Sequence, residues 1–79
     1  MSNARQQMIY GLAHCSDATA NRINNRLQQC NVRVVREDGS TEPNFTIRTR
    51  QQLVGAMQDD PTIKCVQYNF NQKWTTAQA

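Results

Sequence analysis

The chain has 79 residues and a mass of 9.0 kDa, which is enough for one small domain. Leu, Ile, Val and Phe together number only 14, but the formal net charge is +3 and only 19% of the residues are charged. A disordered chain would combine few large apolar residues with a high net charge, and the second condition is not met. No run of 18 apolar residues is present, so these figures exclude a membrane-spanning helix, a coiled coil and a multidomain enzyme.

The first predicted element is a strand over residues 7–13. Apolar residues fall on both sides of its alternation, which is typical of a central strand that is covered on at least one face. The alternation leaves open which face is buried. One face would carry Met8, Tyr10 and Leu12, and the other would carry Ile9, Gly11 and Ala13.

A helix is predicted next, over about residues 17–29. Ser16 and Asp17 can each accept a hydrogen bond from the first free amides, which favours a helix start at this point. Apolar residues then recur at spacings of three and four and define one buried stripe. The stripe consists of Ala20, Ile23, Leu27 and Cys30, and the neighbouring face carries Arg22, Arg26 and Gln29.

Two strands, over residues 32–37 and 44–48, are predicted to form a hairpin. The intervening Asp38-Gly39-Ser40 is a turn signal, because glycine readily adopts the positive φ of tight turns. Pro43 disfavours helical geometry at the residue before it. We therefore expect a loop of about half a dozen residues between the two strands.

A second helix is predicted to begin at Thr49, because residues 49–52 match the capping box, with Gln52 as its closing residue. Asp59-Asp60-Pro61 ends this helix, since acids oppose the dipole there and proline cannot continue it. A last strand follows over about residues 63–71, and Trp74 closes the ordered part of the chain.

The predicted order is β-α-β-β-α-β, the split βαβ pattern of ferredoxin-like folds. We expect one α+β domain over residues 6–74, with an antiparallel four-stranded sheet and two helices on one face. Residues 1–5 and 75–79 are expected to be flexible termini. The alternative is a different small α+β sheet in which the first strand lies at an edge or is absent.

Two helices on one face would leave the other face of the sheet uncovered. The predicted core face carries Val32, Val34, Phe45, Ile47, Val66, Tyr68 and Phe70. The predicted uncovered face carries Arg33, Val35, Thr46, Arg48, Cys65, Gln67 and Asn69. The RNA-recognition motif places aromatic residues on its central strands, whereas here the alternation puts Phe45 inside, so we assign the chain to no family.

The residues that carry chemistry do not form a catalytic or metal-binding pattern. His14 and Cys15 are adjacent, and adjacent strand residues point to opposite faces. No two of Cys15, Cys30 and Cys65 lie within four residues, unlike the ligands of structural zinc sites. We therefore expect no enzyme, no cofactor and no metal.

Function is expected to reside in binding. The odd number of cysteines and the absence of an apolar leader predict a cytoplasmic protein, with no membrane partner. The small core favours an accessory or regulatory protein that acts by protein–protein interaction, including as a homodimer. The alternative is a nucleic-acid-binding protein, because guanidinium groups suit phosphate. Its candidate residues are Arg22, Arg26, Arg33, Arg48 and Arg50.

Overall fold

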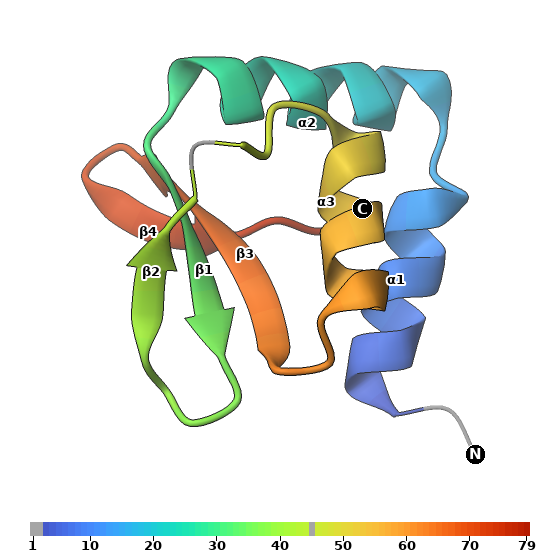
Figure 1. Ribbon diagram of the computed structural model, residues 1–79. Coiled ribbons are helices and arrows are strands. Elements are labelled where there is room, and N and C mark those ends of the chain that lie inside the picture. Colours follow the sequence, from blue (N-terminus) through green and yellow to red (C-terminus); the bar gives the residue numbers. More distant parts are fainter. Residues whose placement is uncertain (1–2, 45) are drawn as a thin grey trace.

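The computed structural model describes residues 3–44 and 46–79 and shows three helices beside a four-stranded antiparallel sheet (Figure 1). The strand order is β2-β1-β3-β4, and each neighbouring pair is antiparallel. In chain order the elements are α1 (Ala4–Ala13), α2 (Asp17–Gln29), β1 (Val32–Arg36), β2 (Thr41–Pro43), α3 (Arg50–Asp59), β3 (Ile63–Phe70) and β4 (Lys73–Thr76). The α+β class and the antiparallel four-stranded sheet are confirmed. The ferredoxin-like order and the count of two helices are not confirmed.

The segment predicted as the first strand, residues 7–13, belongs instead to helix α1. The Asn3 side chain accepts a hydrogen bond from the Gln6 amide at 2.8 Å, and the Gln6 side chain accepts one from the Asn3 amide at 3.3 Å. This reciprocal capping box starts the helix at Ala4, within the segment predicted to be a flexible terminus. Leu12 is fully buried and Tyr10 is 67% exposed. A strand would place these two residues on one face, whereas a helix places them on different sides.

Helix α2 and strand β1 agree with their predictions. The Ser16 side chain accepts a hydrogen bond from the Thr19 amide at 3.2 Å and caps α2, whose stripe buries Ile23 and Leu27. In β1, Val32 and Val34 are buried. The capping residue and the spacing of apolar residues were sufficient to predict these two elements, because such local features do not depend on the packing between elements.

The partner strand of β1 is β2 at residues 41–43, not the predicted 44–48. Gly39 has a φ of 86°, and its amide donates to Arg36 O at 2.9 Å, so the chain reverses within a few residues. Pairing then begins at once, with Val35 opposite Thr41 and Arg33 opposite Pro43. Pro43 is tolerated because β2 is an edge strand.

Residues 46–49 connect β2 to α3, and Phe45 lies outside the described residues. Ile47 is nevertheless buried at 2% exposure, which confirms it as a core residue although it lies on no strand. Thr49 caps α3 as predicted, accepting from the Gln52 amide at 3.1 Å. The Gln52 side chain reaches one residue further back than the capping box requires and accepts from the Arg48 amide.

The C-terminal segment forms a hairpin that the sequence did not reveal. Strands β3 and β4 are joined by Asn71 and Gln72, which have φ values of 52° and 60°. Positive φ at both positions is typical of the type I′ turn, which usually contains glycine. Residues 75 and 76, predicted to lie in a flexible tail, belong to β4, and the Ala77 amide donates to Val66 O at 2.8 Å. Ala77 is 1% exposed.

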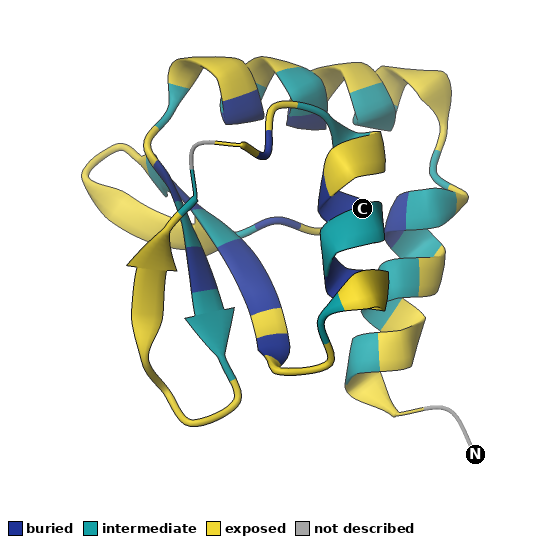
Figure 2. Cartoon of the chain, viewed as in Figure 1, coloured by how far each residue is buried: buried dark blue, intermediate teal, exposed yellow. Residues whose placement is uncertain are grey.

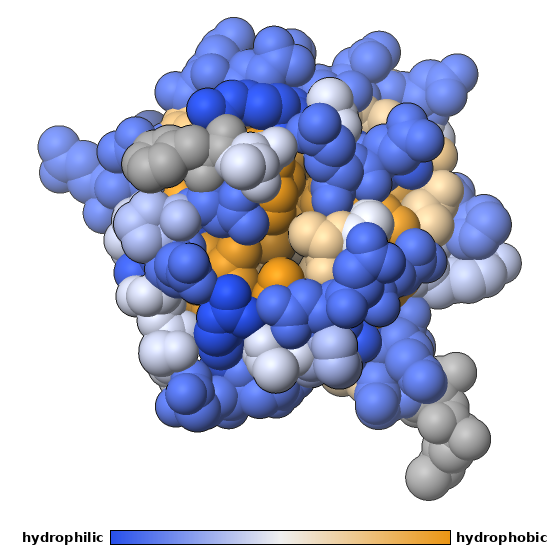
Figure 3. Space-filling view, viewed as in Figure 1, coloured by the Kyte–Doolittle hydropathy of each residue, from blue (hydrophilic) through white to orange (hydrophobic). Residues whose placement is uncertain are grey.

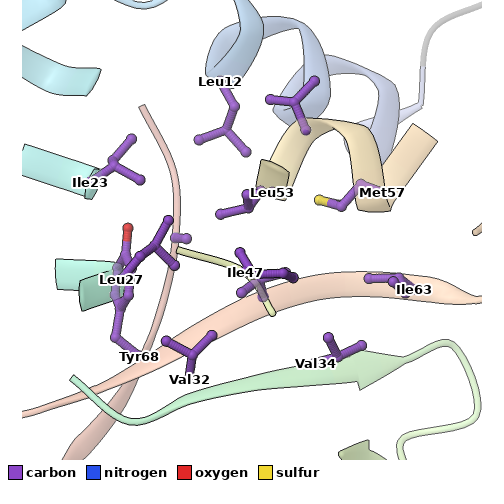
Figure 4. Close-up of a cluster of buried hydrophobic side chains, with 13 residues drawn as sticks. Leu12, Ile23, Leu27, Val32, Val34, Ile47, Leu53, Met57, Ile63 and Tyr68 are labelled. Carbon is purple, nitrogen blue, oxygen red and sulfur yellow. The ribbon is translucent and has the colours of Figure 1, made fainter. Parts of the chain in front are cut away.

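The core lies between the sheet and the helices (Figures 2 and 4). Leu12 of α1, Ile23 and Leu27 of α2, and Leu53 and Met57 of α3 meet the valines of β1 and Ile63, Val66 and Tyr68 of β3. The surface in Figure 3 is mostly polar, and apolar side chains show through a hollow at the centre of this face. Phe70, predicted in the core, is 41% exposed, whereas Cys65, predicted on the uncovered face, is buried.

Candidate nucleic-acid interface

The five predicted arginines come from four different segments of the chain. Arg22 and Arg26 lie on α2, Arg33 lies on β1, Arg48 precedes α3, and Arg50 is the first residue of α3. The Arg50 amide donates to Asn24 Oδ1 at 2.6 Å, which attaches the start of α3 to α2. On a helix, positions two apart do not share a face, so Arg50 meets α2 on a different side from Arg26.

Arg26 is held against aromatic rings at the end of β3. Its guanidinium carbon lies 4.5 Å from the centre of the Phe70 ring and 5.9 Å from that of the Tyr68 ring. Both separations fall within the range of cation–π attraction. Arg22 lies one turn earlier on the same helix face, so its charge also faces this region.

Tyr68 lies beneath these two arginines. Its ring is 1% exposed, and its hydroxyl is buried with no hydrogen-bond partner among the described residues. In Figure 4 the hydroxyl oxygen lies beside α2. Burial raises the pKa of Tyr68 above its usual value, and the positive charges of Arg22 and Arg26 oppose that rise. The phenol therefore stays neutral and acts as an apolar support for Arg26.

Arg33 forms a second pair with an aromatic residue. Its guanidinium carbon lies 4.1 Å from the centre of the Trp74 ring, and its Nε donates to Gln67 Oε1 at 2.8 Å. Arg33 and Gln67 are direct partners in the β1–β3 register, and Trp74 lies on β4 on the other side of β3. The Trp74 side chain therefore reaches across β3 to cover Arg33. These two contacts hold the guanidinium in place.

A groove runs over the face that carries Arg33. It has a volume of about 370 Å³, within the range of about 300–1,000 Å³ that small-molecule sites occupy. Trp74 from edge strand β4 and Pro43 from edge strand β2 stand on opposite sides of Arg33. The lining residues are Asn31, Val32, Arg33, Thr41, Pro43 and Trp74.

Both arginine–aromatic pairs lie at the same end of the sheet, the Arg26 pair on the face toward the helices and the Arg33 pair on the other face. Val32 at the start of β1 pairs with Tyr68, and the Asn31 carbonyl accepts from the Asn69 amide at 2.8 Å. The β3–β4 turn then sets Phe70 opposite Lys73 and Asn69 opposite Trp74. We call this end of the sheet, with both of its faces, the basic end, and it consists of Arg22, Arg26, Arg33, Phe70, Lys73 and Trp74.

The acidic residues gather mostly at the opposite end of the sheet. Arg36, at the far end of β1, forms ion pairs with Glu42 at 2.8 Å and with Asp60 at 2.9 Å. Hydrogen bonds from Thr62 and Arg36 lower the pKa of Asp60 to about 2, so this carboxylate stays charged. Glu37 and Asp38 follow β1 in the adjoining turn. The positive charges of the basic end therefore face solvent without neighbouring carboxylates on β1 or β3.

His14 and Cys15, the candidate nucleophile–base pair, take part in structural contacts at the end of α1. His14 stacks on Tyr10 with ring centres 4.3 Å apart, and the Cys15 thiol donates to Leu12 O at 3.4 Å. Both interactions close the end of α1 and give no nucleophile–base pair. Within residues 3–44 and 46–79, no cluster of three His, Cys, Asp or Glu side chains is suited to a metal ion. In the same residues, no helix has the length and apolar character needed to cross a bilayer.

Phe70 and Trp74 are the site residues that sequence reasoning missed. The alternation of β3 predicts Phe70 in the core, and the sequence pattern predicts Trp74 only as the end of the ordered chain. A usable signal was the spacing of four residues between two aromatics around the polar pair Asn71-Gln72. With a two-residue turn, this spacing places both aromatics beside the turn, where Phe70 pairs with Lys73 and Trp74 with Asn69.

Comparison with known proteins identifies no protein that is similar to this chain. No family model matches the chain, and no curated protein or solved structure is significantly similar to it.

Proposed function

We propose that this protein binds single-stranded nucleic acid through the basic end. The observation that carries this proposal is the pairing of Arg26 with Phe70 and of Arg33 with Trp74 at one end of the sheet. Single-strand binders combine positive charge for the backbone with aromatic rings on which bases stack. The geometry supports binding alone, with no residue assigned to a catalytic step.

Each part of the basic end has a distinct role in this proposal. Arg22 and Lys73, which are exposed, and Arg26, which is half-buried, supply positive charge for phosphates. The exposed parts of Phe70 (41%) and Trp74 (38%) supply stacking surface. The two rings flank the β3–β4 turn on opposite faces of the sheet, so a nucleic-acid strand that wraps around the turn would meet both of them.

Titration of a labelled single-stranded oligonucleotide at several salt concentrations tests this proposal. If three or four cations bind phosphates, log K should fall with log salt at a slope of about −2 to −3, given about −0.7 per phosphate for single strands. Replacement of Arg26 with alanine should weaken binding and reduce the slope by about 0.7. Trp74 is the only tryptophan, so its fluorescence should be quenched as bases stack on it.

Lys64→Ala is the matched control. It removes one exposed positive charge from β3, but at the opposite end of the strand from Phe70. Its binding constant and salt slope should equal those of the unmodified chain. Weak, salt-independent binding of every oligonucleotide, or equal effects of Arg26→Ala and Lys64→Ala, would contradict the proposal.

A homodimer is the second candidate, favoured by the unpaired outer edge of β4. This strand lies at the edge of the sheet with four residues, three of them exposed, and exposed edges can pair with another strand. A dimer that supports the fold should melt at a temperature that rises with protein concentration. A monomeric mass in solution together with a melt independent of concentration would contradict it.

A further inference from the structure

We infer that the groove beside Trp74 recognises a guanine base, with Arg33 as the residue that reads it. This inference rests on the proposed single-strand binding and adds a base preference to it. Phosphate contacts carry no sequence information, whereas contacts to base edges do. Arg33 is the basic residue whose geometry suits the second role.

The Arg33 guanidinium is already oriented before any ligand binds. The Trp74 ring centre lies 4.1 Å from its guanidinium carbon, and Nε donates to Gln67 Oε1 at 2.8 Å, so two contacts hold the group in place. Among the described residues, neither terminal nitrogen of Arg33 donates a hydrogen bond or joins an ion pair. The fork of Nη1 and Nη2 therefore remains for an external acceptor, with little freedom left to lose on binding.

A planar fork of two donors needs two acceptors side by side. Guanine presents N7 and O6 in this arrangement, whereas adenine presents N7 beside an amino donor and cytosine presents a donor. Arginine bidentate to guanine N7 and O6 is accordingly the commonest specific contact of this kind. An adenine in the same position would set its amino group against one of the Arg33 donors.

The walls of the groove favour a flat ring over an isolated phosphate. Trp74, whose ring packs against the Arg33 guanidinium, and the apolar Pro43 form the walls of the groove on opposite sides of Arg33. Asn31 and Thr41 add polar side chains along the same groove and can bond the remaining edges of a base. Arg26 instead lies over the partly exposed Phe70, without such a groove, and is assigned to phosphate.

The test compares short uridine oligonucleotides that differ only at one central base. At fixed salt, an oligonucleotide with central guanine should bind about ten-fold or more tightly than one with adenine, the size of one bidentate pair. Inosine, which keeps N7 and O6, should bind like guanine. The analogue 7-deazaguanine lacks the N7 acceptor and should lose most of the preference.

Protein variants separate base reading from charge. Arg33→Lys keeps the charge but loses the fork, so it should abolish the guanine preference while the salt slope stays unchanged. Arg26→Lys is the matched control and should keep the preference. Circular dichroism and thermal melting establish that both variants fold.

The outcomes distinguish the two proposals. Equal affinity for all central bases with a normal salt slope overturns guanine recognition and leaves single-strand binding in place. A preference that survives in Arg33→Lys also overturns the assignment to Arg33. The absence of salt-dependent binding to any of the oligonucleotides overturns both proposals.

Discussion

Replacement of Leu53 with alanine is expected to lower the free energy of unfolding by about 3–4 kcal/mol. Leu53 is fully buried near the centre of α3, and Figure 4 places it between Leu12 of α1 and Ile47. A domain of this length has a total stability on the order of 4–12 kcal/mol. Loss of this one side chain therefore removes a large share of the stability, because few large apolar residues are present to compensate.

Chemical denaturation at constant temperature measures this change, with Leu53→Met as the control. Methionine nearly conserves the volume and should cost less than about 1.5 kcal/mol. Equal and small losses for the two substitutions would show that the site collapses freely around the cavity. That result would contradict a close-packed junction of α1, α3 and the sheet.

Replacement of Arg5 with methionine is expected to lower the unfolding free energy by about 2 kcal/mol, and the melting temperature by roughly 10 °C. Arg5 lies in the first turn of α1, and its guanidinium donates to the carbonyls of Met57, Asp60 and Ile63. The Met57 and Asp60 carbonyls belong to the end of α3, where carbonyl groups lack partners within the helix. The positive charge also complements the negative end of the α3 dipole.

Two further substitutions test whether the Arg5 hydrogen bonds cause this effect. Arg5→Lys keeps the charge but has no planar fork, so its stability should lie between those of the unmodified chain and Arg5→Met. Gln7→Met places the same methionine at an exposed position of α1 and should be nearly neutral. An unchanged melting temperature for Arg5→Met would show that water replaces the arginine at these carbonyls without loss of stability, and it would contradict the prediction.

The elements that could be predicted are those with local start signals. Ser16 and Thr49 cap their helices as expected, and Val32 and Val34 alternate into the core. Helix α1 was mistaken for a strand because a short apolar run fits both periodicities. Its decisive signal, the reciprocal bonding of Asn3 and Gln6, begins within the predicted flexible terminus of residues 1–5.

The candidate site could be predicted only by residue type. Arg26 and Arg33 were named from the sequence as potential phosphate ligands, but their aromatic partners were not. The partnership of Arg33 with Trp74 depends on β4 pairing with β3, and the Asn71-Gln72 turn that permits it lacks the usual glycine. A contact between residues 41 positions apart follows from tertiary structure and not from any local pattern.

The core residues on β3, and Ala77 after β4, come late in the sequence, which has a consequence for the order in which the chain folds. A nascent chain emerges from its N-terminal end, so α1 leaves the ribosome first. Its packing partners include α3, and the tail beyond β4 reaches it as well, since a Cβ on Gly11 would lie 3.7 Å from Ala79 Cβ. Strand β3, which carries the central part of the core, comes after residue 62. Until β3 has been synthesised, the apolar faces of α1, α2 and α3 lack their packing partner. The core therefore forms only when almost all of these residues have been synthesised.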